Sequence, residues 1–356
     1  MTDVLIVGSG PTGLTLACEL ASGGATVRVL EARSGPHRES RGKGLTPDSL
    51  KVLAGLGAAE GLEAIGTRGV VLRKYFDGAH VNDTPSGGEG ILIGQWQVEE
   101  ALRRRLADLG VTVEYEARVT EITQDGAGVT ASLADGRSVR AGYAAGCDGG
   151  HSSVRRLLGI PFEGRTEQTE TMVLGDVRAP GLSRAYWHQW FTSEGGGILL
   201  CPMPGTDSFQ LQASPELSES GEVLPPSLES FQRLFDRHAR VPGIRLADPT
   251  WLSAWRVNIR MAGRIREGRI FLAGDAAHVH PIAGGLGMNT GIQDAAALGR
   301  ALLGALAGPA TEGVLDAYEA ERLPAAALVL ADTAARHERV RVAIREPGRG
   351  TEAGMG

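Results

Sequence analysis

Two glycine-rich segments near opposite ends of the 356-residue chain constrain its fold more than any other feature. Residues 7–13 read Val-Gly-Ser-Gly-Pro-Thr-Gly, and residues 274–278 read Gly-Asp-Ala-Ala-His, with a further glycine run over 284–289. Each segment follows a short apolar run and precedes a helical pattern, which is typical of the turn that leaves a buried parallel strand. Their presence in one chain predicts a single long ligand that touches two distant stretches of sequence.

The first segment has the Gly-x-Gly-x-x-Gly spacing of a dinucleotide site, in a predicted strand–helix–strand unit. Gly8 allows the tight turn, Gly10 lets a pyrophosphate approach the backbone, and Gly13 lets the helix pack close to the strand. Glu31 ends the second strand and can accept the hydroxyls of an adenosine ribose, whereas its charge would repel a 2′-phosphate. This segment does not distinguish NAD from FAD.

The second segment favours FAD. An apolar strand over 269–273 ends in a Gly-Asp turn, and Asp275 can accept hydrogen bonds from a ribityl chain. A helix that starts near Met288 would direct free N–H groups and its positive dipole end at the N1/C2 edge of a flavin.

A third motif lies between them, over residues 146–155, and reads Gly-Cys-Asp-Gly-Gly-His-Ser-Ser-Val-Arg. The three ordered motifs resemble those of the FAD-dependent aromatic hydroxylases, the single-component flavoprotein monooxygenases typified by para-hydroxybenzoate hydroxylase. The resemblance extends from residue 2 to about 322 and is nearest to the branch that tailors polyketides and other polycyclic aromatics. In relatives the third motif lies near the pyrophosphate and is implicated in handling both FAD and the nicotinamide.

The expected fold class is α/β: a Rossmann-like FAD-binding domain of the glutathione-reductase type with an inserted α+β substrate domain built on an antiparallel sheet. The FAD-binding domain is expected to comprise residues 1–70, 92–162 and 262–356, and the substrate domain 71–91 and 163–261. Strands predicted over 186–191, 198–203 and 209–213 and a helix over 227–239 supply the inserted sheet and its cover.

The resemblance implies a set of cofactor-binding residues: Gly8, Gly10, Pro11, Thr12, Gly13, Glu31, Ala32, Arg33, Arg41, Gln95, Asp148, Gly149, Asp275, Pro281, Gly287, Met288 and Asn289. Pro281 and Gly284 are expected near the flavin; no catalytic side chain is assigned. An ordinary surface ion pair is the alternative for Arg41, and a helix cap is the alternative for Gln95. Arg155 is either a further cofactor contact or a surface cation on its helix.

The substrate residues are expected to be Tyr186, His188 and Trp190, which share one face of the predicted strand, together with Ile282. The alternative is that these aromatic side chains form the core between sheet and helix.

Departures from the family pattern bear on the substrate. The family often has Pro-Pro-Thr-Gly where this chain has Pro281-Ile282-Ala283-Gly284, and the replaced residues line the substrate side of the flavin in relatives. His151 replaces an arginine that is common in the polyketide branch. Many relatives continue into a thioredoxin-like C-terminal domain, and this chain is expected to stop before one could form.

The chain has one dinucleotide fingerprint, and FAD is expected to occupy it tightly but without a covalent bond. NAD(P)H therefore has no such site of its own and is expected to bind transiently. The resemblance then implies hydroxylation of an aromatic or polycyclic substrate with O₂ through a flavin C4a-hydroperoxide, so no nucleophilic triad is expected. Two alternatives stay open: another flavin-dependent oxidation (Baeyer–Villiger insertion, oxidative decarboxylation or dehydrogenation), or a non-catalytic subunit that binds flavin or substrate.

Composition excludes several other classes. The net charge is −6 with dispersed Lys and Arg, which argues against nucleic acid or a membrane surface as partner. No apolar run reaches membrane-spanning length, and no basic segment precedes the first strand, so a cytoplasmic monomer or homodimer is expected. Three dispersed cysteines exclude a disulfide framework, and no cluster has metal-ligand spacing.

Overall fold

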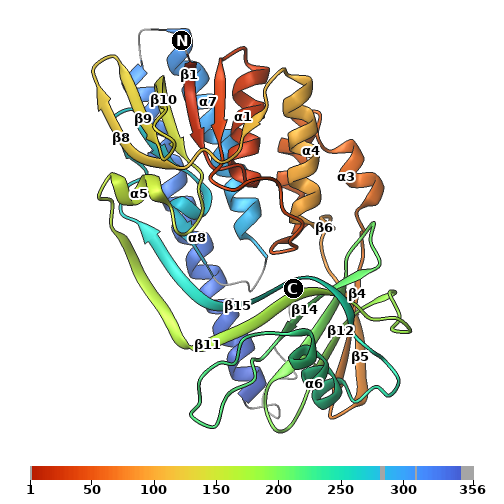
Figure 1. Ribbon diagram of the computed structural model, residues 1–356. Helices are drawn as coiled ribbons and strands as arrows, with labels where there is room; N and C mark the ends of the chain where they lie inside the picture. The colour runs from red at the N-terminus through yellow and green to blue at the C-terminus, as the bar shows by residue number, and fades with distance from the viewer. Residues whose placement is uncertain (1, 281–284, 309–310, 346–356) are drawn as a thin grey trace.

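Two eight-stranded sheets organise the protein, and the computed structural model describes residues 2–280, 285–308 and 311–345 of it (Figure 1). The first sheet lies beside most of the helices, and the second lies at the far end of the two long strands β11 and β15. This arrangement confirms the predicted α/β fold class with a largely antiparallel second sheet.

The first sheet has a parallel centre in the order β17-β10-β1-β2-β7. These strands are β1 (Thr2–Val7), β2 (Val27–Leu30), β7 (Val113–Glu114), β10 (Ser138–Gly146) and β17 (Ile270–Leu272). The short β16 (Arg266–Glu267) and the hairpin of β8 (Val119–Asp125) and β9 (Gly128–Leu133) add antiparallel strands. Val4, Leu5 and Ile6 of β1 are all fully buried, as expected for a parallel strand covered on both faces.

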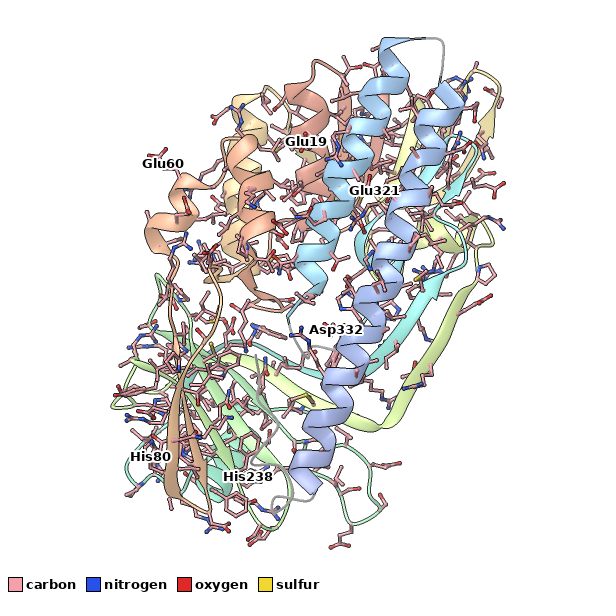
Figure 2. The ribbon with its side chains drawn as sticks, turned by 180° about the vertical axis from the view of Figure 1, so that it is seen from behind. Glu19, Glu60, His80, His238, Glu321 and Asp332 are labelled. Atoms are coloured by element: carbon pink, nitrogen blue, oxygen red, sulfur yellow. The ribbon has the colours of Figure 1, made fainter. Side chains whose placement is uncertain are left out.

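Helices pack around this sheet: α1 (Pro11–Ser22), α2 (Pro47–Gly55), α3 (Glu60–Ile65), α4 (Gln95–Asp108), α5 (Ser153–Leu157), α7 (Gly287–Ala307) and α8 (Thr311–Arg345). Helix α1 contacts both α4 and α7, and α7 runs beside α8, as Figure 2 shows from behind. The small ladder of β3 (Lys43–Leu45) and β6 (Ile91–Gly94) lies next to α4.

The second sheet has the order β18-β15-β11-β14-β13-β12-β4-β5. Its strands are β4 (Val71–Phe76), β5 (Ala79–Pro85), β11 (Phe162–Arg178), β12 (Tyr186–Phe191), β13 (Gly197–Pro202), β14 (Ser208–Ala213), β15 (Ala247–Ala262) and β18 (His278–Val279). All neighbours are antiparallel except β12 and β4. Helix α6 (Leu228–Ala239) packs on one face over a core that includes Trp190, Phe209 and Phe235.

Two local features of the fold have no clear signal in the sequence. The chain is not extended between β7 and β8, where Glu116 has a φ of +57° that no strand accommodates. The chain also forms the long antiparallel pair β11 and β15, whose sequences lack the alternation that marks a half-buried strand.

Candidate active site

The three motifs meet because they leave three adjacent parallel strands. Val7 of β1 pairs with Gly146 of β10, and Gly146 pairs with Leu272 of β17. The segments that follow these residues therefore start from one edge of the sheet. Ligands of open α/β sheets bind outside the carboxyl ends of the strands, so this edge is the expected cofactor site.

The three glycines of the first motif have distinct environments. Gly8 has a φ of +105°, and a Cβ atom there would lie 2.3 Å from the Cys147 carbonyl oxygen. A Cβ on Gly13 would lie 2.0 Å from the Gly8 carbonyl oxygen. A Cβ on Gly10, the N-cap of α1, would meet no protein atom within 4 Å. Packing thus explains Gly8 and Gly13, and the open side of Gly10 leaves the N-terminus of α1 accessible to an anion.

Thr12 connects the first motif to the last. A Cβ on Gly274 would lie 2.4 Å from Thr12 Oγ1, and a Cβ on Gly291 of α7 would lie 2.2 Å from the same atom. The Thr12 side chain therefore occupies a notch between the Gly274 turn and α7. Its position explains why both neighbours are glycines.

Glu31 lies just beyond β2 and is 6% exposed. One carboxylate oxygen accepts hydrogen bonds from Ser9 N (3.0 Å) and Ser9 Oγ (2.8 Å), and the other from Arg33 N (3.0 Å) and Nε (3.2 Å). Burial opposes ionisation, but the hydrogen bonds and the charge of Arg33 outweigh it and lower the pKa of Glu31. The carboxylate is ionised, and a ribose hydroxyl would replace the Ser9 hydroxyl or the Arg33 side chain as its donor.

The Asp148-Gly149 segment precedes α5, and Asp148 binds backbone N–H groups of its first turn. Asp148 Oδ2 accepts hydrogen bonds from Ser153 N (2.6 Å) and Val154 N (3.2 Å), while its buried Oδ1 has no partner among the described residues. Gly149 has a φ of +81°, which favours glycine. Arg155 is not a surface cation: it is 5% exposed and donates to the carbonyl oxygens of Ala276 and Gly150, both at 2.8 Å. It thereby joins the second motif to the third.

Asp275 follows the Gly274 turn and is exposed to solvent. Desolvation raises the pKa of Asp275, whereas the charges of His278 and Arg41 oppose this rise. A Cβ on Gly287 would lie 4.0 Å from Asp275 Oδ1, so the first residue of α7 lies beside the acid. The predicted ribityl and flavin contacts are therefore neighbours.

The side chain of Asn289 forms hydrogen bonds within the protein. Its Oδ1 accepts from Thr46 N (2.9 Å), and its Nδ2 donates to the carbonyl oxygens of Gly44 (3.2 Å) and Gly285 (3.1 Å). These bonds fix α7 against β3. A cofactor contact at Asn289 would thus involve the backbone, as the sequence predicts for the start of this helix.

Arg41 and Gln95 flank the same region. Arg41 is exposed and forms an ion pair with Glu39, as in the alternative given for it. Its positive charge also opposes the rise that desolvation causes in the pKa of Asp275. Gln95 Nε2 donates to Glu99 Oε1 (2.9 Å), and a Cβ on Gly42 would lie 3.0 Å from Gln95 Oε1 and 3.7 Å from Met288 Cβ. The segment around Gly42 is therefore enclosed by the starts of α4 and α7.

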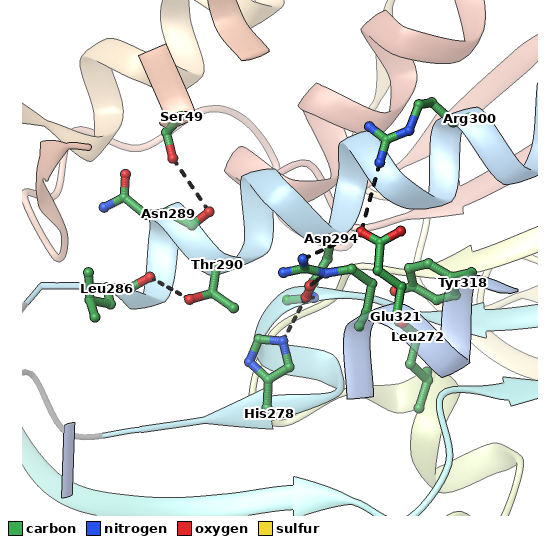
Figure 3. A network of polar contacts seen from close by, with 12 residues as sticks. Ser49, Leu272, His278, Leu286, Asn289, Thr290, Asp294, Arg300, Tyr318 and Glu321 are labelled. Carbon is green, nitrogen blue, oxygen red and sulfur yellow. Dashed lines mark hydrogen bonds and ion pairs between the residues drawn. The ribbon is translucent and has the colours of Figure 1, made fainter. Parts of the chain in front are cut away.

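A buried charged network that the sequence analysis missed lies behind the Gly-Asp turn (Figure 3). Asp294 Oδ2 accepts from Gly274 N (3.0 Å) and lies 2.6 Å from His278 Nε2, while Asp294 Oδ1 accepts from Arg322 Nε (2.8 Å). Burial disfavours both charges, but the ion pair raises the pKa of His278 and lowers that of Asp294. An aspartate inside the apolar helical pattern of 293–306 was the available signal.

The predicted substrate residues of β12 pack against neighbouring side chains of the second sheet and α6. Trp190 is 1% exposed and packs edge-on against Phe235 of α6, and His188 stacks on Trp190 with ring centroids 5.0 Å apart. Tyr186 lies under the Arg73 guanidinium at 3.4 Å. His188 and Trp190 thus belong to the α6 face, as in the alternative that they form the core between sheet and helix, and their role as substrate residues stays a prediction.

The opposite face of the second sheet turns toward the first. Trp187 of β12 lies under the Lys43 ammonium, 4.3 Å from the ring centroid, and Asp176 of β11 accepts a hydrogen bond from Ser40 N (3.1 Å). The segment that includes Ser40 and Lys43 also contains Gly42, which adjoins Met288. This face therefore borders the expected flavin edge.

A cavity of about 360 Å³ lies away from the motifs, lined in part by Thr67, Leu92, Arg184 and Pro204. None of the expected cofactor residues lines it. The chemistry of the three motifs, rather than this cavity, identifies the active site.

Some expected features lie outside the described residues, namely Pro281, Ile282 and Gly284. Among the residues that the structure does describe, no group of three His, Cys, Asp or Glu side chains could hold a metal ion. Within the same ranges, no helix is long and apolar enough to span a membrane.

The profile of the FAD binding domain family matches residues 1–333, which is most of the chain. The chain belongs to this family of FAD-dependent monooxygenases. A flavin-dependent monooxygenase of Mycobacteroides abscessus is 40% identical over 359 residues, covering 94% of this chain and 74% of the relative. A rifampicin monooxygenase of Streptomyces venezuelae is 37% identical, covering 98% of this chain and 73% of the relative.

Solved structures agree with these relatives. A ternary complex of aklavinone-11 hydroxylase with FAD and aklavinone superposes with a TM-score of 0.82 at 29% identity, covering 100% of this chain and 71% of that one. The protein is therefore an FAD-dependent monooxygenase of the aromatic and polyketide tailoring type.

The residues of this monooxygenase fit FAD. The open side of Gly10 suits a pyrophosphate, the unpartnered Asp148 Oδ1 provides a free acceptor, and Asp275 faces solvent beside α7. All three features lie at the carboxyl edge of the first sheet, where a ligand spanning β1 to β17 would contact them together.

Proposed function

We propose that this monooxygenase hydroxylates an aromatic or polycyclic, polyketide-like substrate with NAD(P)H as reductant and O₂ as oxidant. The observation that carries the proposal is the polar and aromatic face of the second sheet, with Trp187 and Asp176, set against the segment beside Met288. A flat aromatic ring held there would lie between the sheet and the flavin edge.

The cofactor assignments follow the motifs. The backbone around Gly10 would hold the pyrophosphate, Glu31 and Arg33 the adenosine end, and Asp275 the ribityl chain. Bound FAD supplies hydride acceptance and O₂ activation. The protein positions the substrate and excludes water, and the N-terminus of α7 stabilises negative charge at the flavin edge.

The two sheets are proposed to be two domains with the boundaries expected from the sequence. The FAD-binding domain would then carry all three motifs, and the second sheet with α6 would carry the substrate. NAD(P)H would bind transiently, since the dinucleotide fingerprint is used by FAD.

The test uses purified holoprotein. Bound flavin is measured by absorbance, and NADH or NADPH oxidation is followed with and without rifampicin and aklavinone, together with simple polyphenols. Stimulated oxidation with incorporation of one ¹⁸O atom from ¹⁸O₂ on an aromatic carbon supports the proposal. Insertion of the labelled atom into a carbon–carbon bond, or oxidation without incorporation, favours another flavin-dependent reaction. Bound flavin without stimulation by any aromatic compound contradicts the proposal.

A further inference from the structure

A row of buried polar side chains crosses the second sheet on the face turned away from α6. Trp251 pairs with Asp176, Asp176 with Gln210, and Gln210 with Cys201, so these residues of four adjacent strands point to the same side. Asp176 is 4% exposed and Gln210 is fully buried. Burial of a polar group costs free energy unless the group is hydrogen-bonded, so apolar packing alone does not account for polar residues at these positions.

A loop from the first half of the chain covers part of this row. Gln210 Nε2 donates to the Ser40 carbonyl oxygen, and Gln210 Oε1 accepts from the Lys43 ammonium. The ammonium also lies over the Trp187 ring. Among the described residues no carboxylate lies within ion-pair distance of Lys43. This cation therefore faces an aromatic surface with an amide as its polar partner.

The row retains hydrogen-bonding capacity that the protein does not use. Asp176 Oδ1 and the indole nitrogen of Trp187 are buried without hydrogen-bond partners among the described residues. Burial raises the pKa of Asp176, and hydrogen bonding from Ser40 and from the Trp251 indole opposes this rise. An acceptor, a donor and a cation thus border one patch of the sheet.

Resting on the proposed function, we propose that Asp176 and Lys43 orient the substrate by recognising a hydroxyl group next to a carbonyl oxygen on a fused aromatic ring. Asp176 Oδ1 accepts the hydrogen bond of the hydroxyl, and the Lys43 ammonium donates to the neighbouring carbonyl oxygen. The Trp187 indole, with the Lys43 ammonium over its ring, borders the same site. Such a pair selects the hydroxy-ketone pattern over rings that carry ethers at the same positions, because an ether cannot donate to Asp176.

The experiment measures selectivity in the FAD-loaded protein. The probes are 1,8-dihydroxyanthraquinone and 1,8-dimethoxyanthraquinone, and the dissociation constants come from quenching of tryptophan fluorescence and from flavin difference spectra. The wild type is expected to prefer the dihydroxy probe about tenfold, the effect of one charge-assisted hydrogen bond. D176N and K43M should lose most of this preference, measured as the ratio of the two dissociation constants. K43R retains the cation and should retain the preference.

The exposed Lys51 on α2 supplies a matched control, since K51M removes a lysine charge outside the site and should keep the wild-type preference. Unchanged selectivity in both D176N and K43M, with FAD content preserved, overturns the inference and leaves the hydroxylase proposal intact. Equal loss in K43R and K43M overturns the role of the cation. If D176N fails to retain FAD, the two Lys43 variants decide the result. A wild type that binds FAD but is stimulated by no aromatic compound contradicts the proposed function itself.

Discussion

Asp294 bridges His278 and the Gly274 amide inside the protein, 2.6 Å from the imidazole and 3.0 Å from the backbone nitrogen. This carboxylate therefore holds the turn that presents Asp275 to solvent. Arg322 of α8 donates a hydrogen bond to the other carboxylate oxygen of Asp294. The support for the predicted ribityl contact thus comes from α7 and α8, outside the motif itself.

Loss of this carboxylate charge should be costly. In D294N the buried His278 loses its counter-ion and Arg322 loses the closer of its two carboxylate partners. Removing one partner of a buried pair typically costs about 3–5 kcal/mol. We expect a lower free energy of unfolding in urea together with weaker FAD binding. The matched control is D332N, because Asp332 is half-exposed and pairs with Arg336 on the surface of α8, 2.8 Å away. Equal stability of D294N and D332N would contradict the structural role of the network.

The pH dependence of stability should report the same pair. The raised folded-state pKa of His278 gives a stabilisation that is complete below the unfolded pKa of about 6.5 and is lost as pH rises through the folded value. The lowered pKa of Asp294 acts oppositely and loses its contribution as pH falls below about 4. Urea unfolding of wild type and H278Q between pH 5 and 9 should show the difference in free energy shrinking toward high pH. A difference that grows with pH would refute this assignment.

Gly10 and Gly13 should respond differently to alanine. G13A places a Cβ against the Gly8 carbonyl oxygen and should lower thermal stability of the FAD-free protein markedly. G10A meets no protein atom, so the FAD-free protein should melt near the wild-type temperature while FAD affinity falls. Melting curves with and without added FAD separate the two effects. Full FAD affinity in G10A would contradict the placement of the pyrophosphate.

The notch that holds Thr12 allows a rescue experiment. G291A should destabilise the protein by about 1–3 kcal/mol, because its Cβ would lie 2.2 Å from Thr12 Oγ1. In the double variant T12A/G291A the nearest atom of residue 12 is Cβ, at 3.5 Å, so most of the loss should be recovered. Additive losses in the double variant, measured by urea unfolding, would show that the contact with Thr12 is not the cause.

The sequence predicted the parts of the fold that carry strong local signals. The run over 186–191 has the bounds of β12 because aromatic residues stand between turn-forming stretches. The ribbon of β11 and β15 escaped prediction because its exposed Arg, Thr and Glu residues leave no periodic pattern. The alternation of side chains along β12 correctly predicted that Trp187 and His188 lie on opposite faces of the sheet. Which face meets the first sheet is decided by the packing of α6 on the other. The pair of His278 and Asp294 joins two elements through tertiary packing, which no local spacing encodes.

The order of the strands in the first sheet has a consequence for biosynthesis. β10 sits between β1 and β17, yet β17 begins at Ile270, more than two thirds of the way along the chain. A nascent polypeptide can therefore pair β1, β2 and β10 on the ribosome while one side of the cofactor cradle is still missing. The proposed contacts at Asp275 and Asn289 leave the ribosome after those at Gly10 and Glu31, so we expect the complete FAD site to form only once β17 and α7 have been synthesised.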